Sequence, residues 1–169
     1  VFLKVNIYGM INKSVFVISV IFFAVLSRFL PHPPNFTPIA AIALLSSKGF
    51  GNRWIVFLIP LVSLFISDLF LGLHANIPFV YFSFILITLL GRYVKKVNLG
   101  TILLASTIFF LVSNLGVWLL YYPININGLI NCYTLALPFF LNTILGDLVY
   151  GALLIYPFYV LQKKNLMAA

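Results

Sequence analysis

Long runs of apolar residues, interrupted only by short groups of basic residues, prolines and glycines, dominate this sequence. Of its 169 residues, 63% are hydrophobic and 7% are charged, whereas about a quarter of the residues in a soluble domain are charged. A soluble core could not enclose so many apolar side chains. A bilayer core about 30 Å thick needs roughly 20 apolar residues per helix, so the length allows about six crossings. We therefore predict an all-α, polytopic integral membrane protein.

The limits of the apolar runs predict six helices within a single transmembrane domain, residues 1–169. The predicted helices cover residues 14–30, 37–47, 54–72, 78–93, 101–122 and 138–161. The first run has a basic flank, as a signal peptide does, but it lacks a small-residue cleavage pattern, so we expect a retained helix. The second run would rise only about 16 Å, half of the hydrocarbon thickness. It either extends into the headgroups and crosses, or it is re-entrant.

Basic residues stand at the ends of these runs and not along one helical face. They are Lys4, Lys13, Arg28, Lys48, Arg53, Arg92, Lys95, Lys96, Lys163 and Lys164. This placement indicates topology signals and no nucleic-acid partner. If the second helix crosses, the positive-inside rule leaves only Arg28 outside; if it does not, the amino terminus is outside. Both arrangements predict a cytoplasmic carboxyl terminus.

The chain has only two carboxylate side chains, Asp68 and Asp147, and both fall within predicted membrane helices. A charge at the centre of such a helix costs at least about 2.5–3.5 kcal/mol, so each carboxylate needs a partner. Each could bind a cation, a proton or a polar substrate. Alternatively, each makes a buried bond between helices, to Arg28, His32 or an asparagine, or lies at the membrane interface.

A polar helical face surrounds Asp147. Thr143 and Gly151 lie one turn to either side of it, and Tyr150 follows three residues later, so these residues share one face. We expect this face to point inward, with Asp147 and Tyr150 as candidate contacts for a solute.

Two further stripes carry amide side chains. Asn114 and Trp118 lie one helical turn apart, and an amide beside an indole suits a polar ring compound; an interfacial Trp beside a buried Asn explains the pattern equally well. Asn142 and Gly146 form the other stripe, which is either a ligand contact or a small-residue packing surface.

Prolines at positions 31, 33, 34 and 38 impose an extended backbone after the first predicted helix. Irregular backbone at membrane depth must be covered by protein or line a wet cavity. His32 and Asn35, inside this stiff segment, are therefore pocket candidates, and a structural turn is the alternative. A single histidine between prolines does not define a metal site.

Common catalytic motifs are missing from the sequence, including Gly-x-Ser-x-Gly, His-Glu-x-x-His, phosphate-binding Gly-rich loops and Cys-x-x-Cys. The single Cys132 allows neither an internal disulfide nor a thiolate metal cluster. Only His32 and His74 could act as bases near neutral pH. We expect no enzyme and no cofactor; a membrane enzyme that uses Asp147 and His32 on a membrane-soluble substrate is the alternative, as is a structural or assembly subunit.

Five segments resemble DUF6580, a family of bacterial membrane proteins to which transport is attributed. They are RFLPHPPNFTPIAA at 28–41, SDLFLG at 67–72, LGR at 90–92, SNLGVW at 113–118 and LPFFLNTILGD at 137–147. That family in turn resembles the S components of energy-coupling-factor (ECF) vitamin transporters, which bind a small solute and dock on a transmembrane coupling subunit driven by ATPases.

The resemblance implies a six-helix S-component-like bundle in a bacterial cytoplasmic (inner) membrane, with both termini in the cytoplasm. It implies uptake of a vitamin-like solute or cation, an outer lid at residues 31–38, and a pocket. The implied pocket residues are Asn114, Trp118, Asn142 and Asp147. S components often dock through Ala-x-x-x-Ala in the first helix. Here that helix has only Ala24, so a solitary transporter without ATPases stays open.

Overall fold

The computed structural model describes residues 13–49 and 54–163, and these residues form helices joined by short loops, with no strand in either range. The elements are α1 (Lys13–Phe29), α2 (Ile39–Gly49), α3 (Ile55–Leu71), α4 (Ile77–Tyr93), α5 (Leu99–Tyr121), α6 (Ile126–Tyr150), the π-helical turn η2 (Gly151–Ile155) and α7 (Tyr156–Lys163). The predicted all-α class is confirmed for this part of the chain. The basic residues Lys4, Arg53 and Lys164 lie outside the described residues.

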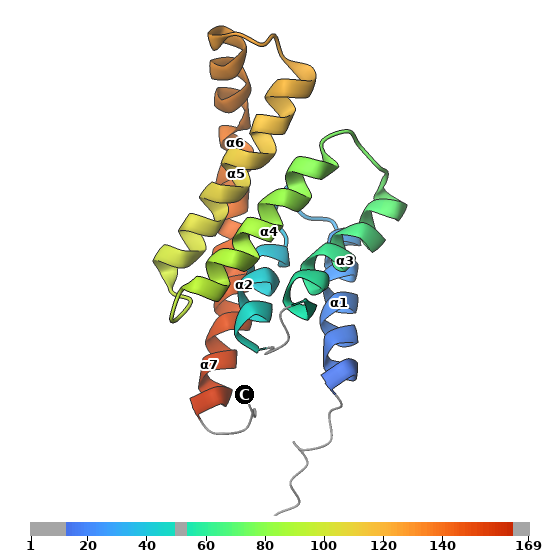
Figure 1. Ribbon diagram of the computed structural model, residues 1–169, viewed down its shortest axis with the longest axis vertical. Coiled ribbons are helices and arrows are strands. Elements are labelled where there is room, and N and C mark those ends of the chain that lie inside the picture. Colours follow the sequence, from blue (N-terminus) through green and yellow to red (C-terminus); the bar gives the residue numbers. More distant parts are fainter. Residues whose placement is uncertain (1–12, 50–53, 164–169) are drawn as a thin grey trace, which may run out of the picture.

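Successive helices run in alternating directions (Figure 1). The start of α1 and the end of α7 lie at the lower end of the molecule, while the loops from α3 to α4 and from α5 to α6 lie at the upper end. The hairpin of α5 and α6 extends above the other helices. Because α6, η2 and α7 continue one another, they form a single long final rod.

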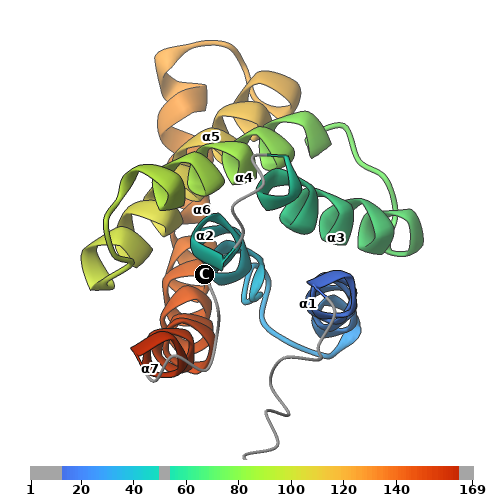
Figure 2. The ribbon, with the colours of Figure 1, turned by 60° about the horizontal axis from the view of Figure 1, so that its bottom comes forward.

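The short helix α2 occupies the centre of the fold, surrounded by the other helices (Figure 2). Its sequence is rich in alanine, and seven of its eleven residues are buried. Small side chains permit close approach between helices. At the α2–α4 crossing, a Cβ on Gly91 would lie 3.1 Å from the Leu44 backbone. Helix α2, which is about half as long as a membrane-spanning helix, is therefore the core helix of the molecule.

The last long helix differs from its predicted position. The structure begins α6 at Ile126, twelve residues before the predicted start at Pro138, whereas the limits of the first five helices agree within two residues. Asn125 caps the helix, because its side chain accepts a hydrogen bond from Gly128 N (2.8 Å). Pro138 removes only the bond to the carbonyl of Thr134, a residue that is exposed.

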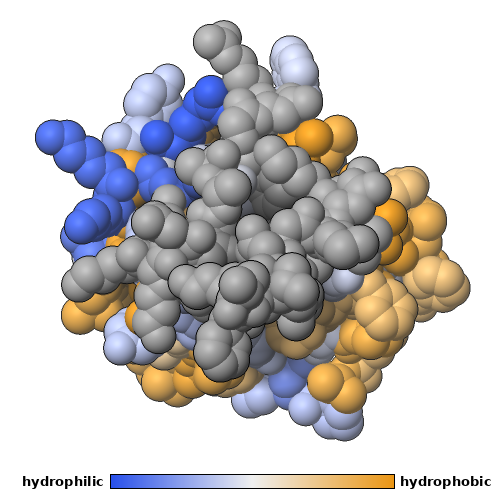
Figure 3. Space-filling model, turned by 90° about the horizontal axis from the view of Figure 1, so that it is seen from below, coloured by the Kyte–Doolittle hydropathy of each residue, from blue (hydrophilic) through white to orange (hydrophobic). Residues whose placement is uncertain are grey.

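Within residues 13–49 and 54–163, two helices are long and apolar enough to span a membrane, Leu99–Tyr121 and the continuous helix Ile126–Val160. The other apolar helices in these ranges have 17 residues or fewer. Large apolar side chains point outward on several helices. Examples are Phe22, Phe70, Leu141 and Leu153, each more than 60% exposed. Seen from below, hydrophilic side chains gather at the upper left of the view, and apolar ones occupy most of the right side and the lower left edge (Figure 3).

Candidate functional site

A buried ion pair joins α1, α3 and α4. Arg28 Nη1 lies 2.7 Å from Asp68 Oδ1, and the Tyr81 hydroxyl donates to Asp68 Oδ2 (2.9 Å). Arg28 Nη1 also donates to Ser67 Oγ (2.5 Å). Both carboxylate oxygens are thus paired, and the Asp68 side chain is only 3% exposed. This arrangement matches the structural alternative for Asp68, a buried bond between helices.

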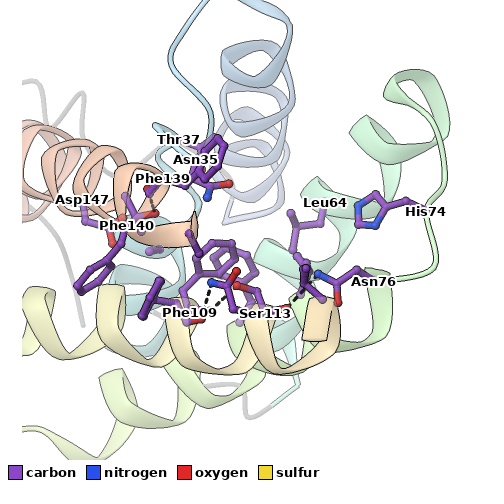
Figure 4. Close-up of a pocket in the computed structure, with 18 of the residues that line it drawn as sticks. Asn35, Thr37, Leu64, His74, Asn76, Phe109, Ser113, Phe139, Phe140 and Asp147 are labelled. Atoms are coloured by element: carbon purple, nitrogen blue, oxygen red, sulfur yellow. Dashed lines mark hydrogen bonds between the residues drawn. The ribbon is translucent and has the colours of Figure 1, made fainter. Parts of the chain in front are cut away.

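A cavity of about 470 Å³ lies between the 31–38 loop and helices α3 to α6. Polar side chains line it together with aromatic ones. The polar lining residues are Arg28, His32, Asn35, Thr37, His74, Asn76, Ser113, Asn114, Tyr122, Thr143 and Asp147, and the phenylalanines are Phe84, Phe109, Phe110, Phe139 and Phe140. Asp147 lies at one end, and His74 and Asn76 lie at the other (Figure 4).

The proline-rich loop forms one wall of this cavity. A turn closes where Phe36 N donates to the Pro33 carbonyl (3.0 Å). Asn35 has a φ of 67°, a left-handed conformation that Asn tolerates better than most residues. The loop lies directly on α6, since a Cβ on Gly146 would come within 2.9 Å of Phe36 Cα. Gly146 is therefore a packing contact that lets the loop approach the helix.

Asp147 is 4% exposed and faces the cavity from α6. Its Oδ2 accepts a hydrogen bond from the Ser106 hydroxyl (2.6 Å) on α5. Within the described ranges, no basic side chain pairs with it. One turn earlier, the buried Thr143 donates its hydroxyl to the Phe139 carbonyl (2.9 Å). Asp147 thus differs from Asp68, because its carboxylate lacks a cationic partner in this part of the chain.

Aromatic rings cover the middle of the cavity. Phe110 of α5 stacks on Phe140 of α6 with ring centroids 4.4 Å apart. Phe84 of α4 packs on Phe109 (5.4 Å), and Tyr133 meets Phe110 edge-on (5.5 Å). These contacts join three helices and leave ring surfaces facing the cavity.

Two polar atoms in the lining are buried and have no hydrogen-bond partner among the described residues: His32 Nε2 and Asn76 Oδ1. His32 Nδ1 lies 2.9 Å from the Pro33 carbonyl, and Asn76 Nδ2 donates to the Ser113 carbonyl (3.1 Å). Buried polar atoms normally have a partner. A bound molecule is one way to supply it.

Among the residues predicted to bind a solute, those that line the cavity are His32, Asn35, Asn114 and Asp147, and two other functional candidates, Arg28 and His74, line it as well. Trp118 turns away, because its indole donates to the Pro123 carbonyl (3.1 Å) beyond the end of α5. Tyr150 packs against Phe36 with ring centroids 5.7 Å apart. Asn142 and Asp68 also lie outside the lining. Binding by any of these residues stays a prediction.

Sequence reasoning did not select several lining residues, notably Asn76, Ser113 and Thr37. It also overlooked the doublets Phe109–Phe110 and Phe139–Phe140, which supply the aromatic wall. Two phenylalanine pairs on neighbouring helices were a usable signal. Asn76 precedes Pro78 by two residues, a pattern typical of a helix start, but this reveals nothing of its cavity contact.

The described ranges bring no three His, Cys, Asp or Glu side chains together into a group that could hold a metal ion. Cys132 is a buried free thiol that contacts the Asn114 carbonyl at 3.6 Å. The chemistry available at the site is therefore hydrogen bonding, one carboxylate and aromatic surface.

Comparison with known proteins shows that one family model matches most of the chain. Residues 10–168 match DUF6580, described as a family of unknown function. No curated protein and no solved structure matches the chain.

Proposed function

This chain belongs to the DUF6580 family, and from the geometry of its cavity we propose that it is an integral membrane protein that binds a small solute and takes part in its uptake. The cavity carries this proposal. Its volume of about 470 Å³ falls in the range of about 300–1,000 Å³ found for small-molecule sites. It combines aromatic walls with a few convergent polar groups, as such sites do.

In the proposed topology, helices α1 to α5 and the final rod cross the membrane in turn. The 17-residue helices α1, α3 and α4 rise about 26 Å each. Helix α2 is shorter, but other helices enclose it, so its backbone is shielded from lipid. The exposed apolar side chains on the outer helices form the lipid-facing surface in this arrangement.

The distribution of charge supports a cytoplasmic lower end. Three exposed basic residues lie at the α4–α5 connection: Arg92, Lys95 and Lys96. Lys48 lies near the end of α2 and donates to the Val94 carbonyl in the same region. Arg28 is paired with Asp68 inside the protein, so it is not a free charge of an outer loop. The positive-inside rule then favours cytoplasmic ends.

Asn35, which is exposed in the 31–38 loop, tests this topology. We expect an Asn35→Cys protein, made in a Cys132→Ser background, to react with an impermeant thiol reagent in intact cells. A Lys95→Cys protein in the same background is the matched control for the opposite side, and it should react only after lysis. The reverse labelling pattern would refute the orientation.

We further propose that the chain works as an S-component-like capture protein, with the 31–38 loop as the lid. Its contact with α6 at Gly146 supports this role, since lid and cavity wall meet there. The alternating helices, with both described ends at the lower end of the molecule, also agree with such a bundle. The same proposal includes docking of this chain on a transmembrane coupling subunit that is driven by ATPases.

Solute capture can be measured on the purified protein. In mild detergent, the protein from cells grown in rich medium should carry a stoichiometric small molecule that mass spectrometry identifies. Ala136→Phe places a ring inside the cavity, because Ala136 lines it and is 7% exposed. We expect this variant to lose the solute while it remains folded.

Ala152→Phe adds the same ring on an exposed surface position and should retain the solute. Normal retention by Ala136→Phe would show that the solute binds elsewhere. A folded wild-type protein that is repeatedly empty would contradict tight capture. The thermal stability of both variants should also be measured, because overpacking alone typically destabilises a protein by about 1–3 kcal/mol.

A further inference from the structure

We propose that the cavity selects an organic cation, a compound in which a protonated nitrogen is attached to a flat apolar body. This inference rests on the proposed solute-binding function and names the chemical class of the solute. It follows from which donors and acceptors in the lining are already in use, and from the charge that the lining leaves unbalanced.

The hydroxyl groups nearest the Asp147 end of the cavity donate their hydrogen atoms to other groups of the protein. Ser106 donates to Asp147 (2.6 Å), and Thr143 donates to the Phe139 carbonyl (2.9 Å). Farther along the cavity, Ser113 donates to the Phe109 carbonyl (2.6 Å). Since a hydroxyl has one hydrogen and two lone pairs, Thr143 and Ser113, two of the four residues with hydroxyl groups that line the cavity, have only lone pairs left to offer a ligand.

The amide and imidazole groups show the same bias. Asn114 Nδ2 donates to the Phe110 carbonyl (2.7 Å), and Asn76 Nδ2 donates to the Ser113 carbonyl. Asn114 Oδ1 receives no hydrogen bond from the described residues. The same holds for Asn76 Oδ1, which lies against Gly116 of α5. A carbonyl oxygen only accepts, so the contact with Pro33 assigns the hydrogen of a neutral His32 to Nδ1. Its buried Nε2 is then an acceptor.

Charge in the lining points the same way. Arg28 is neutralised by Asp68 at 2.7 Å, whereas Asp147 has no basic partner in the described ranges. With neutral histidines and an ionised Asp147, the described lining taken together with Asp68, which pairs with Arg28, has a net charge of −1. A buried charge is unfavourable unless it is paired, and a bound monocation would provide the partner. Arg28 Nη1 is engaged on Asp68 and Ser67, so this nitrogen is not free to bind an anion.

The walls favour an organic cation over a metal ion. No group of three potential metal ligands occurs among the residues that the structure describes, and the cavity is far larger than one ion. Aromatic faces attract a cation within about 6 Å of the ring. Phe139 and Phe140 lie near Asp147, and Phe109 lies between them and the Asn76 end (Figure 4). A flat ligand would place its cationic nitrogen at Asp147 and its body between these rings.

Three probes of nearly equal size and shape test the charge directly: benzamidine, a flat cation with N–H donors, benzamide, which is neutral, and benzoate, an anion. We expect the purified full chain to bind benzamidine at least about tenfold more tightly than either of the others, as measured by calorimetry. Asp147→Asn should weaken benzamidine binding at least about tenfold and leave benzamide binding unchanged. Asn131→Ala, an exposed change on the same helix, should alter none of the three.

Equal binding of the three probes, a preference for benzoate, or full benzamidine affinity in a folded Asp147→Asn protein would overturn the cation proposal. A retained natural solute that is neutral or anionic would do the same while leaving the capture function standing. An empty protein that also fails to bind every probe would instead contradict the capture function itself. A retained solute with a protonated nitrogen would support both.

Discussion

Arg28→Met should lower the free energy of unfolding by about 3–5 kcal/mol, the loss typical of removing one partner from a buried ion pair. The remaining Asp68 carboxylate is 3% exposed and, among the described residues, would keep only the Tyr81 hydroxyl as a partner. Because the pair joins α1 to α3 and Tyr81 adds α4, the loss should loosen all three helices together. Unfolding by SDS in mixed micelles, followed by circular dichroism, measures the effect.

The two ends of the pair should respond differently. Asp68→Asn should be milder, since the Arg28 side chain that it leaves is 19% exposed and lines the cavity. The double variant Arg28→Met/Asp68→Leu removes both charges and should recover much of the stability lost in Arg28→Met. Single variants that unfold within about 0.5 kcal/mol of the wild type, the range of ordinary surface changes, would show that the pair contributes little.

The sequence was sufficient to predict the helical class, the limits of five helices within two residues, and the family. Runs of apolar residues and their breaks are local signals, and the five resembling segments span most of the chain. The start of α6 was missed because the stretch after Asn125 carries Asn127, Asn131 and Thr134, which are typical of a loop. In the structure all three are exposed on the helix.

The candidate site was predictable where helical spacing alone decides which way a side chain faces. Thr143 and Asp147 do share one buried face of α6. The partner of Asp68 was not predictable in the same way. Arg28, His32 and an asparagine were all candidates, and the choice depends on how α1 and α3 are placed against each other, which no local pattern encodes.

Trp118 illustrates a second limit. One helical turn separates it from Asn114, so a shared face was a reasonable prediction. In the structure, the indole instead donates to the Pro123 carbonyl, while Asn114 lines the cavity. A local hydrogen bond at the end of α5 decides the orientation of the ring, and helical spacing does not include such bonds. The polar loop after α5 was visible in the sequence, but its geometry was not.

Gly146→Leu should reduce retention of the bound solute at least about tenfold, the equivalent of about 1.4 kcal/mol. A Cβ at this position would lie 2.9 Å from Phe36 Cα and 3.3 Å from its carbonyl carbon. Backbone cannot move aside as a flexible side chain can, so the whole 31–38 loop must shift. That loop carries His32, Asn35 and Thr37, which form one wall of the cavity. Mass spectrometry of the purified variant measures the retained solute.

Overpacking at this contact should also lower stability, by about 1–3 kcal/mol. Gly100→Leu is the matched control, because Gly100 is exposed in the first turn of α5, and the closest contact of an added Cβ would be 3.4 Å. The control should keep its solute and its stability. If Gly146→Leu kept both as well, the loop would not depend on its contact with α6, and its role as a lid that closes against this helix would be refuted.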